Sequence, residues 1–486
     1  MKILALAVIT AAVAGFAPPG QTALNEGREG RPNFVFLLSD DQTFRALGCL
    51  GDSPLRTPQL DRLAGEGMLF THVFNQGSWS GAVCICSRAM LHTGQFLFHA
   101  QQSIDRAPLW GETLGRAGYR TFAIGKWHNG QAAALRGFQA GRAQGAGMYE
   151  AGEAMYHRPA DGNGWRPWDR ALGGHWKPAV WDFNSGKAGS DYTVETHTSE
   201  LYADEAIRFL REEVSRDERP FFLYVAFNAP HDPRQAPKEW VDLYPVDSMP
   251  LPPNYLPEHP FDQGDARLRD EILAPFPRTE AAVRLHLAEY FAILSHMDHQ
   301  IGRILEALDA SGERDETYVI FTSDHGLAVG QHGLLGKQNQ YEHSIRVPFL
   351  ARGPGIAAGS RCDALVYLQS SYATTCELAG VAVPETVEFP SLVPLLRGHE
   401  LELHSAIFGA YKEFQRMVRT RHHKLILYPE AGVAQLFDLD SDPWERTDLV
   451  GSSEAQGLRA GLLRRLVDLQ AETGDRLELD PAWFAD

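Results

Sequence analysis

The stretch Asn33-Phe-Val-Phe-Leu-Leu-Ser-Asp40-Asp41 determines the fold that we expect. It opens with a short apolar run, and the run ends in two adjacent acids. A continuous apolar run of this length is typical of a strand that is buried on both faces, as in a parallel sheet covered by helices. We therefore predict a buried parallel strand whose carboxyl end carries Asp40 and Asp41.

Three further apolar runs end in polar side chains in the same manner. They are Tyr119–Ile124, followed by Lys126 and His128; Phe221–Phe227, followed by His231; and Tyr318–Thr322, followed by Asp324 and His325. In an open α/β sheet, ligands bind at the edge formed by the carboxyl ends of the strands. We therefore expect these polar side chains to share one site.

Segments between these runs have the apolar spacing of helices. They are Thr57–Glu66, Ser199–Arg216 and Thr279–Ser311. Alternating strands and helices indicate an α/β fold with a large, mixed but mostly parallel sheet sandwiched by helices. We assign this domain to residues 24–400.

The pattern changes after about residue 400. Turn residues separate four short strand-like segments, Ala406–Ala410, Gln415–Arg419, Lys424–Tyr428 and Ala434–Leu439. A helical pattern follows from about Ser453 to Thr473. This succession indicates a smaller C-terminal α+β subdomain, residues 401–486, that carries a short antiparallel sheet.

Two long segments fit neither pattern. Residues 150–190 are rich in Trp and Gly and are too irregular for a strand or a helix. They are either a packed surface insertion or an aromatic wall on which a sugar stacks. Residues 235–280 are rich in Pro and charged residues, and we expect a long connecting insertion there.

The bulk properties and the first residues narrow the class of protein. The 486-residue chain has a net charge of −17, which disfavours nucleic-acid binding but allows a local basic pocket. In residues 1–23, Lys2 precedes the apolar run Ile3–Phe16, which is too short to span a bilayer. We predict a cleaved signal peptide, rather than an N-terminal helix, and an exported protein, periplasmic or secreted, with no membrane span.

The acids at the strand ends point to a metal ion. Adjacent carboxylates such as Asp40 and Asp41 repel each other unless a cation neutralises them, and Asp324 ends a second strand in the same way. Oxygen ligands favour a hard ion such as Ca²⁺ or Mg²⁺, and His325 could add a nitrogen ligand or support the others. The alternative is that these acids cap helices or lie in solvated turns.

The segment Cys84-Ile-Cys86-Ser-Arg88-Ala-Met-Leu-His-Thr-Gly94 contains the candidate nucleophile. Arg88 lies one helical turn after Cys84, where its guanidinium could hold an anion bound at position 84. The alternative is a buried thiol that serves only to pack the core. The chain has five cysteines, an odd number, so an exported protein should hold at least one that is unpaired or modified.

The remaining candidate residues are basic. Lys126, His128, His231 and Lys337 follow strands or lie in a Gly-rich loop. Together with Arg88 and the acids, they suit the departure of a divalent anion from an alcohol: the cations hold the anion and a histidine protonates the leaving oxygen.

These motifs, taken in order, resemble the type I sulfatases of the alkaline-phosphatase-like superfamily. The matching stretches run through most of the chain: Asn33–Asp41, Thr57–Ala64, Cys84–Gly94, Gly125–His128, Ala229–His231, Thr322–Gly326, His332–Lys337 with Tyr341 and Glu342, and Leu436–Leu439 with Asp442, Pro443 and Glu445. Each stretch alone is a weak signal, but the ordered set is specific.

The resemblance implies a mechanism. A maturation enzyme would oxidise Cys84 to formylglycine (3-oxoalanine), and one hydroxyl of its hydrate would attack sulfur. Arg88 and the lysines would hold the sulfate oxygens, and His231 and Lys337 would lie towards the leaving alcohol. His128, with Lys126, would remove a proton from the second hydroxyl.

The resemblance also implies a metal site. One divalent ion, usually Ca²⁺ in this family and less often Mg²⁺, would be held by Asp40, Asp41, Asp324 and His325, together with the residue formed from Cys84. Cys86 is a departure, because the family has Pro or Ala at that position within the stretch that the maturation enzyme reads.

Other activities and several substrates stay open. The rivals are a phosphatase, phosphonate monoester hydrolase or phosphodiesterase of the same superfamily, and an unconverted, non-catalytic anion-binding relative. We expect a sulfated carbohydrate, although choline sulfate and aryl sulfates remain alternatives. Candidate substrate-binding residues are His259, Arg269 and Arg416.

Overall fold

The computed structural model describes residues 30–145, 166–480 and 483. The predicted signal peptide, residues 1–23, lies outside these residues. Within the described ranges, no helix combines the length and the apolar character that crossing a membrane requires.

The apolar run that ends in Asp40 forms the central strand, β1 (Asn33–Asp40), in which every residue is buried. It pairs in parallel with β10 (Thr317–Ser323) on one side and β9 (Phe221–Pro230) on the other. Next to β9 lies β4 (Arg120–Lys126), again in parallel. These strands confirm the predicted parallel core and bring their carboxyl ends to one edge.

Antiparallel and shorter strands extend this core into a twelve-stranded mixed sheet, whose main order is β12-β2-β11-β10-β1-β9-β4-β5-β6-β7. The added strands are β2 (Met68–Phe74), β5 (Ala140–Gly145), β6 (Ala179–Asn184), β7 (Lys187–Ala188), β8 (Tyr192–Thr193), β11 (Arg346–Arg352), β12 (Ser360–Cys362) and β13 (Val366–Tyr367). The prediction that residues 150–190 contain no strand is therefore wrong at β6 and β7. Both are short: β7 is a two-residue strand at the edge, and β6 lies one strand in from it, so neither gives a recognisable alternation in sequence.

Alternate residues of β1 enter opposite cores, as the two-residue repeat of a strand requires. Val35 and Leu37 pack in the core that contains α1 (Pro58–Glu66), α7 (Thr198–Arg208) and α9 (Glu280–Ala310). These three helices confirm the predicted helical segments, although α7 continues after Arg208 as π and 3₁₀ turns to Arg216.

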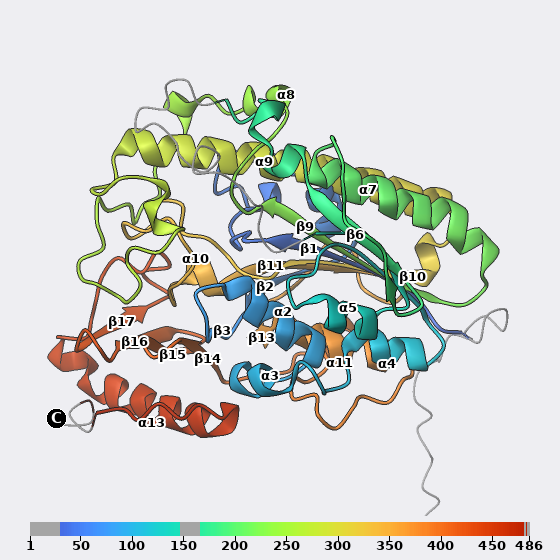
Figure 1. The fold of residues 1–486 in the computed structure, drawn as a ribbon. Coiled ribbons are helices and arrows are strands. Elements are labelled where there is room, and N and C mark those ends of the chain that lie inside the picture. Colours follow the sequence, from blue (N-terminus) through green and yellow to red (C-terminus); the bar gives the residue numbers. More distant parts are fainter. Residues whose placement is uncertain (1–29, 146–165, 481–482, 484–486) are drawn as a thin grey trace, which may run out of the picture.

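Phe34 and Phe36 enter the second core, on the other face of the sheet. There they meet α2 (Val83–Thr93), α4 (Trp110–Arg116) and α11 (Ser371–Leu378). The sheet is therefore sandwiched between two layers of helices (Figure 1). Among the described residues, this part also contains five shorter helices: α3 (Leu97–Ser103), α5 (Gln131–Gly137), α8 (Lys238–Val241), α10 (Glu342–Ile345) and α12 (Val393–Leu396).

The C-terminal part forms the predicted antiparallel sheet, with a helix packed on it. Its strands are β14 (Ala406–Tyr411), β15 (Gln415–Thr420), β16 (His423–Tyr428) and β17 (Val433–Asp438), followed by the helix α13 (Gln456–Thr473).

A fifth strand of this sheet, β3 (Gly77–Ser78), comes from the N-terminal part and lies parallel to β14. Gly77 has a φ of +89°, and a Cβ there would stand 2.1 Å from the Ala410 carbonyl oxygen, so this approach requires glycine. The sequence did not predict β3. The boundary near residue 400, between the catalytic domain and the C-terminal subdomain, stays a prediction.

Candidate active site

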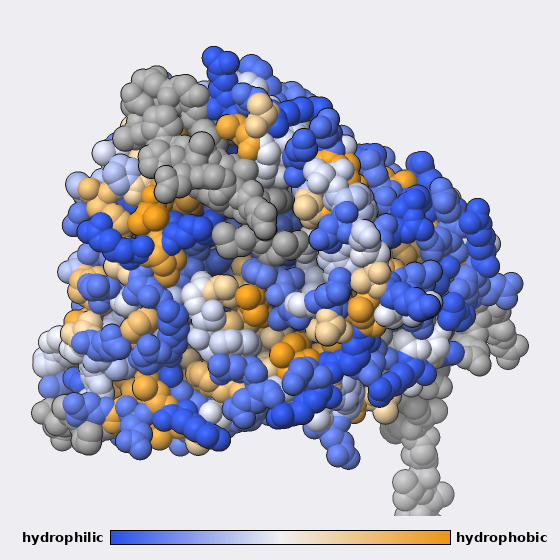
Figure 2. All heavy atoms as spheres, viewed as in Figure 1, coloured by the Kyte–Doolittle hydropathy of each residue, from blue (hydrophilic) through white to orange (hydrophobic). Residues whose placement is uncertain are grey.

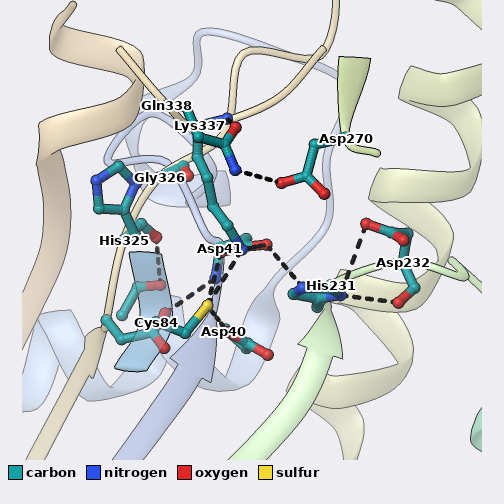
Figure 3. Close-up of polar contacts among 12 residues, drawn as sticks. Asp40, Asp41, Cys84, His231, Asp232, Asp270, His325, Gly326, Lys337 and Gln338 are labelled. Carbon is teal, nitrogen blue, oxygen red and sulfur yellow. Dashed lines mark hydrogen bonds and ion pairs between the residues drawn. The ribbon is translucent and has the colours of Figure 1, made fainter. Parts of the chain in front are cut away.

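The predicted polar residues meet at the carboxyl edge of the parallel strands, as Figure 3 shows for several of them. Asp40 ends β1, and Asp41 follows in a left-handed conformation with φ of +74°. The Asp41 amide donates to Asp324 Oδ1 at 3.2 Å, and the Tyr290 hydroxyl donates to the Asp41 carbonyl at 2.8 Å. These bonds fix the turn that places both carboxylates at the edge.

Three carboxylates converge there without access to solvent. Asp40, Asp41 and Asp324 are at most 1% exposed, and one ligand atom from each of them and from Cys84 lie within 4.8 Å of one another. Burial raises the pKa of Asp40, and it raises that of Asp41 to about 8. Burial acts in the same direction on Asp324, but Arg88 and two lysines outweigh it and hold its pKa below the usual range.

Each carboxylate has a basic partner. Lys126 donates to Asp40, Lys337 donates to both oxygens of Asp41 at 2.6 Å, and Arg88 Nε donates to Asp324 at 2.8 Å. Arg88 Nη2 is buried, stands 3.8 Å from Asp40 Oδ1 and has no hydrogen-bond partner among the described residues. A buried donor of this kind is suited to an oxygen of a bound anion.

Cys84 lies in the first turn of α2, at the centre of these charges. Its Sγ is 3.1 Å from both Asp40 Oδ1 and Lys337 Nζ, and 3.6 Å from Asp41 Oδ1. Burial, with the charges of Asp324 and Asp40, raises the thiol pKa well above its usual value. This environment disfavours the thiolate that cysteine chemistry requires.

Two histidines border the cluster. His231 Nε2 lies 3.7 Å from Asp41 Oδ2, while its Nδ1 donates to the Asp232 carbonyl at 2.8 Å. His128 follows β4 with φ of +71°, and its buried Nδ1 has no partner in the described part of the chain. Burial lowers the pKa of His231 well below its usual value and, with Lys126 and Arg88, lowers that of His128 to about 2. Both imidazoles are therefore neutral in this state.

Two of the predicted residues lie outside the cluster. The His325 ring is not among the ligand atoms that converge, and its Nδ1 donates to the Gly326 carbonyl at 3.1 Å. Arg416 is buried in the C-terminal part, where it pairs with Asp475 and packs against Phe98. The position of Arg416 argues against the substrate contact that we expected, because its guanidinium is used within that subdomain.

The other two substrate-binding candidates differ from each other. His259 is held by the Phe261 carbonyl at 2.7 Å and the Tyr341 hydroxyl at 2.9 Å. Arg269 lies closer to the cluster, because it pairs with Asp232, the residue after His231, and with Asp270. Of these two, the structure brings only Arg269 to the margin of the site.

Several supporting residues had no signal that we recognised in the sequence. Asp270 accepts from Gln338 Nε2 at 2.8 Å and so connects Arg269 to the loop that carries Lys337. His175 donates from Nε2 to the His231 carbonyl at 3.2 Å. Only Asp232 could have been suspected, since it directly follows His231. Asp270 and His175 lie in the two segments that we expected to be insertions.

The fold and this arrangement of acids, cations and histidines define a hydrolase of the alkaline-phosphatase-like superfamily. Residues 32–381 match the family described as Sulfatase, and residues 330–472 match the one described as N-sulphoglucosamine sulphohydrolase, C-terminal. The chain therefore belongs to the sulfatase family, and it is a sulfuric ester hydrolase.

Curated relatives match along most of their length. An arylsulfatase of Clostridium perfringens is 29% identical over 470 residues, covering 91% of this chain and 95% of the relative. An N-acetylglucosamine-6-O-sulfatase of Bacteroides thetaiotaomicron is 24% identical, covering 92% and 87%.

Solved structures share the fold. A protein in complex with its substrate D-glucosamine-2-N,6-O-disulfate has a TM-score of 0.73 at 23% identity, covering 92% of this chain and 99% of that chain. The phosphonate monoester hydrolase of Agrobacterium radiobacter has a TM-score of 0.71 at 22% identity, covering 91% and 96%.

Proposed function

We propose that this sulfatase removes sulfate from a sulfated carbohydrate, using formylglycine made from Cys84 and one bound divalent ion, Ca²⁺ in preference to Mg²⁺. The observation that carries the proposal is the position of Cys84 Sγ, 3.1 Å from both Asp40 and Lys337. The side chain at position 84 thus stands between the groups that would hold a cation and the groups that would hold an anion.

The donor set fits one hard cation. The carboxylate oxygens of Asp40, Asp41 and Asp324 converge within 4.8 Å in a buried place, and oxygen ligands are those that Ca²⁺ prefers. His325 would need to turn its ring to join them. The ion would supply positive charge for the sulfate oxygens, in addition to that of Arg88 and the lysines.

The surroundings of position 84 fit an oxygen nucleophile better than a thiolate. The carboxylates of Asp40 and Asp41 would repel a negatively charged thiolate at position 84. Hydroxyl groups there can instead donate hydrogen bonds to these carboxylates. The Cys84 thiol occupies the place that the hydrated aldehyde would take, and that hydrate would supply the attacking hydroxyl. A neutral His128 nearby can accept the proton of the second hydroxyl.

The basic residues have different roles in the proposed reaction. Arg88 Nη2 and Lys126 bind sulfate oxygens, which orients sulfur for attack and stabilises the charge that develops there. Lys337 is protonated in this state, because Asp41 outweighs the effect of burial on its pKa. His231 carries its one proton on Nδ1, so Lys337 is the better proton donor to the leaving oxygen until His231 gains a second proton.

The proposal also includes a sulfated sugar as the substrate and an exported location for the protein. The relative that acts on an N-acetylglucosamine-6-O-sulfate supports a sulfated sugar here. The apolar run of residues 3–16 supports export to the periplasm or the medium, where sulfated polysaccharides are found.

One experiment tests the nucleophile. The protein is co-expressed with a formylglycine-generating enzyme, and the peptide that contains Cys84 is analysed by mass spectrometry. We expect the aldehyde or its hydrate, together with turnover of 4-nitrophenyl sulfate. Cys84→Ala should abolish turnover, while Cys376→Ala, a buried cysteine outside the cluster, should retain it.

The same preparation separates the rivals. Faster turnover of a phosphonate monoester than of any sulfate ester would favour the hydrolase activity that the Agrobacterium radiobacter structure represents. A thiol that stays unconverted, with no turnover of either ester, would favour an anion-binding relative. Cys86→Pro, which restores the family's residue, then shows whether Cys86 limits conversion.

A further inference from the structure

A second concave surface lies far from the catalytic edge. It is an open groove of about 1160 Å³, bounded by the N-terminal halves of β4 and β5, the end of β6 and the turn into β7. Arg120 lines this groove, and Lys126 lies in the active site at the other end of β4. At about 3.3 Å per residue, the strand separates the two places by roughly 20 Å.

The groove is lined by basic side chains in a strongly acidic protein. The whole chain carries a net charge of −17, yet the lining includes six bases: Arg116, Arg120, Arg136, Arg142, Lys187 and Arg219. Three acids, Glu112, Asp182 and Glu213, face the same space. The local excess of positive charge is therefore opposite in sign to the charge of the molecule.

In most ion pairs at the groove the basic partner is the more exposed one, and only in the pair Arg120–Asp217 among the described ones is it the less exposed. Arg116 is 73% exposed and its partner Glu112 only 13%, and Arg219 is 52% exposed against 24% for Asp217. Arg142 is 32% exposed, against 17% for Glu205 and 28% for Glu213. A ligand that enters the groove therefore meets guanidinium groups before carboxylates. The surface over α4 and α5, which bear Arg116 and Arg136, mixes hydrophilic and hydrophobic residues (Figure 2).

Lys187 completes the basic rim. It is exposed in the short edge strand β7, and no salt bridge to it is found among the described residues. The adjoining turn, Ser185 and Gly186, lines the groove beside the side-chain amides of Asn184 and Gln139. The Ser185 N–H donates to the Gln139 carbonyl, and Gln139 Nε2 donates to the Tyr119 carbonyl. Amide and backbone groups are suited to hydroxyls, and guanidinium groups to sulfate or carboxylate.

We propose that this groove binds a segment of a sulfated glycan chain and so holds a polymeric substrate on the enzyme at a distance from the active site. The proposal rests on the proposed function for the identity of the polymer, although binding can be measured without turnover. The groove combines positive charge with hydroxyl-binding groups, which is the chemistry of such a chain. A DNA strand offers phosphates but few hydroxyls, so it would use the basic side chains of the groove but not its side-chain amides.

Charge reversal at the most exposed positions tests the proposal. The triple variant Arg116→Glu, Lys187→Glu, Arg219→Glu is compared with the control triple Lys177→Glu, Arg303→Glu, Arg361→Glu, which changes net charge equally at exposed sites outside the groove. Binding to chondroitin sulfate and to unsulfated chondroitin is measured by calorimetry at two salt concentrations. We expect the groove triple to bind the sulfated chain about tenfold more weakly than the wild type.

The control triple should lose no more than about twofold, and the wild-type affinity should fall as salt increases. Both triple variants should turn over 4-nitrophenyl sulfate at the wild-type rate, because this small ester, when bound at the active site, is too short to contact the groove. Equal losses in both triples, unchanged binding in the groove triple, or tighter binding of single-stranded DNA than of the glycan would overturn the proposal. Absence of turnover of every sulfate ester by the wild type would instead count against the proposed function.

Discussion

Two buried clusters of charge in this protein have similar compositions but opposite arrangements. The catalytic cluster contains Asp40, Asp41 and Asp324 with Arg88, Lys126 and Lys337. The junction cluster contains Glu342 and Glu445 with Arg346, Arg419 and Lys424, between α10 and the C-terminal sheet.

The difference lies in which charges converge. In the junction cluster, Arg346, Arg419 and Lys424 surround Glu342 at 3.1, 3.2 and 2.9 Å, and none of these five described side chains has an unbonded buried nitrogen or oxygen. In the catalytic cluster the carboxylates converge on one point, and Arg88 retains an unbonded donor. A complete set of partners indicates a structural role, whereas an incomplete set indicates a place for ligands.

The largest effect should come from removing one converging carboxylate. Asp41→Asn should lower kcat/KM for 4-nitrophenyl sulfate by about 10³-fold or more, because a proposed metal ligand and a partner of Lys337 are lost. Urea unfolding in chelator should show a smaller loss of stability than Glu342→Gln, since burial raises the pKa of Asp41 and so offsets part of the loss of its pair with Lys337.

Asp298→Asn is the matched control, because Asp298 is buried outside the cluster and accepts from the amides of Gln59 and Leu60. It should retain activity. A similar loss of activity in both variants would remove the distinction between the two kinds of buried acid.

The junction cluster should respond in the opposite way. Glu342→Gln leaves three cations around a neutral amide, and the free energy of unfolding should fall by about 3 kcal/mol. Activity of the fraction that remains folded should be nearly unchanged when measured at low temperature. A selective loss of kcat in fully folded protein would show that this cluster also takes part in catalysis.

Calcium binding should stabilise the protein through the catalytic cluster and not through the junction cluster, by a free energy somewhat smaller than the loss expected for Glu342→Gln. At a free concentration about 100 times its Kd, Ca²⁺ should stabilise the wild type by about 2.7 kcal/mol, measured as a shift in thermal unfolding after chelator treatment. Asp41→Asn should show little of this shift and Glu342→Gln should show all of it. Equal stabilisation of wild type and Asp41→Asn would place the ion elsewhere.

The smallest effect concerns the uncharged layer below the catalytic cluster. His92 lies one turn after Arg88 in α2, and its ring centre is 4.4 Å from that of Trp127. Burial, with the charge of Arg88, lowers its pKa to about 3. The unfolded chain takes up a proton near pH 6.5 and the folded chain does not, so His92 contributes stability above pH 6.5 that is lost as the pH falls towards 3.

Between pH 7 and pH 5 this loss should amount to about 2 kcal/mol, seen as a difference between wild type and His92→Phe in urea unfolding. Other buried histidines affect both proteins alike and cancel in the comparison. Parallel pH profiles for the two proteins would contradict the assignment to His92.

The sequence predicted what depends on local patterns. The buried runs around Val35 and Leu37, with the acids that follow them, led to the sheet and to its carboxyl edge. The sequence did not predict the contacts and strands that depend on residues far apart along the chain. Nothing in the local sequence shows that Asp475 takes the guanidinium of Arg416, or that Asp270 faces Gln338. Likewise, β6 is a strand because it pairs with β5, and β7 is a strand because it pairs with β6, and not because of their own patterns.

The two-residue strand β3 also sets an order of events during synthesis. Gly77 and Ser78 lie just before the helix that carries Cys84, and their partner strand is Ala406–Tyr411. At 5–20 residues per second, the ribosome needs roughly 15–65 s to make the chain between them. For that interval the segment next to Cys84 cannot be closed into its final sheet, which leaves a window of time in which another enzyme can reach the thiol.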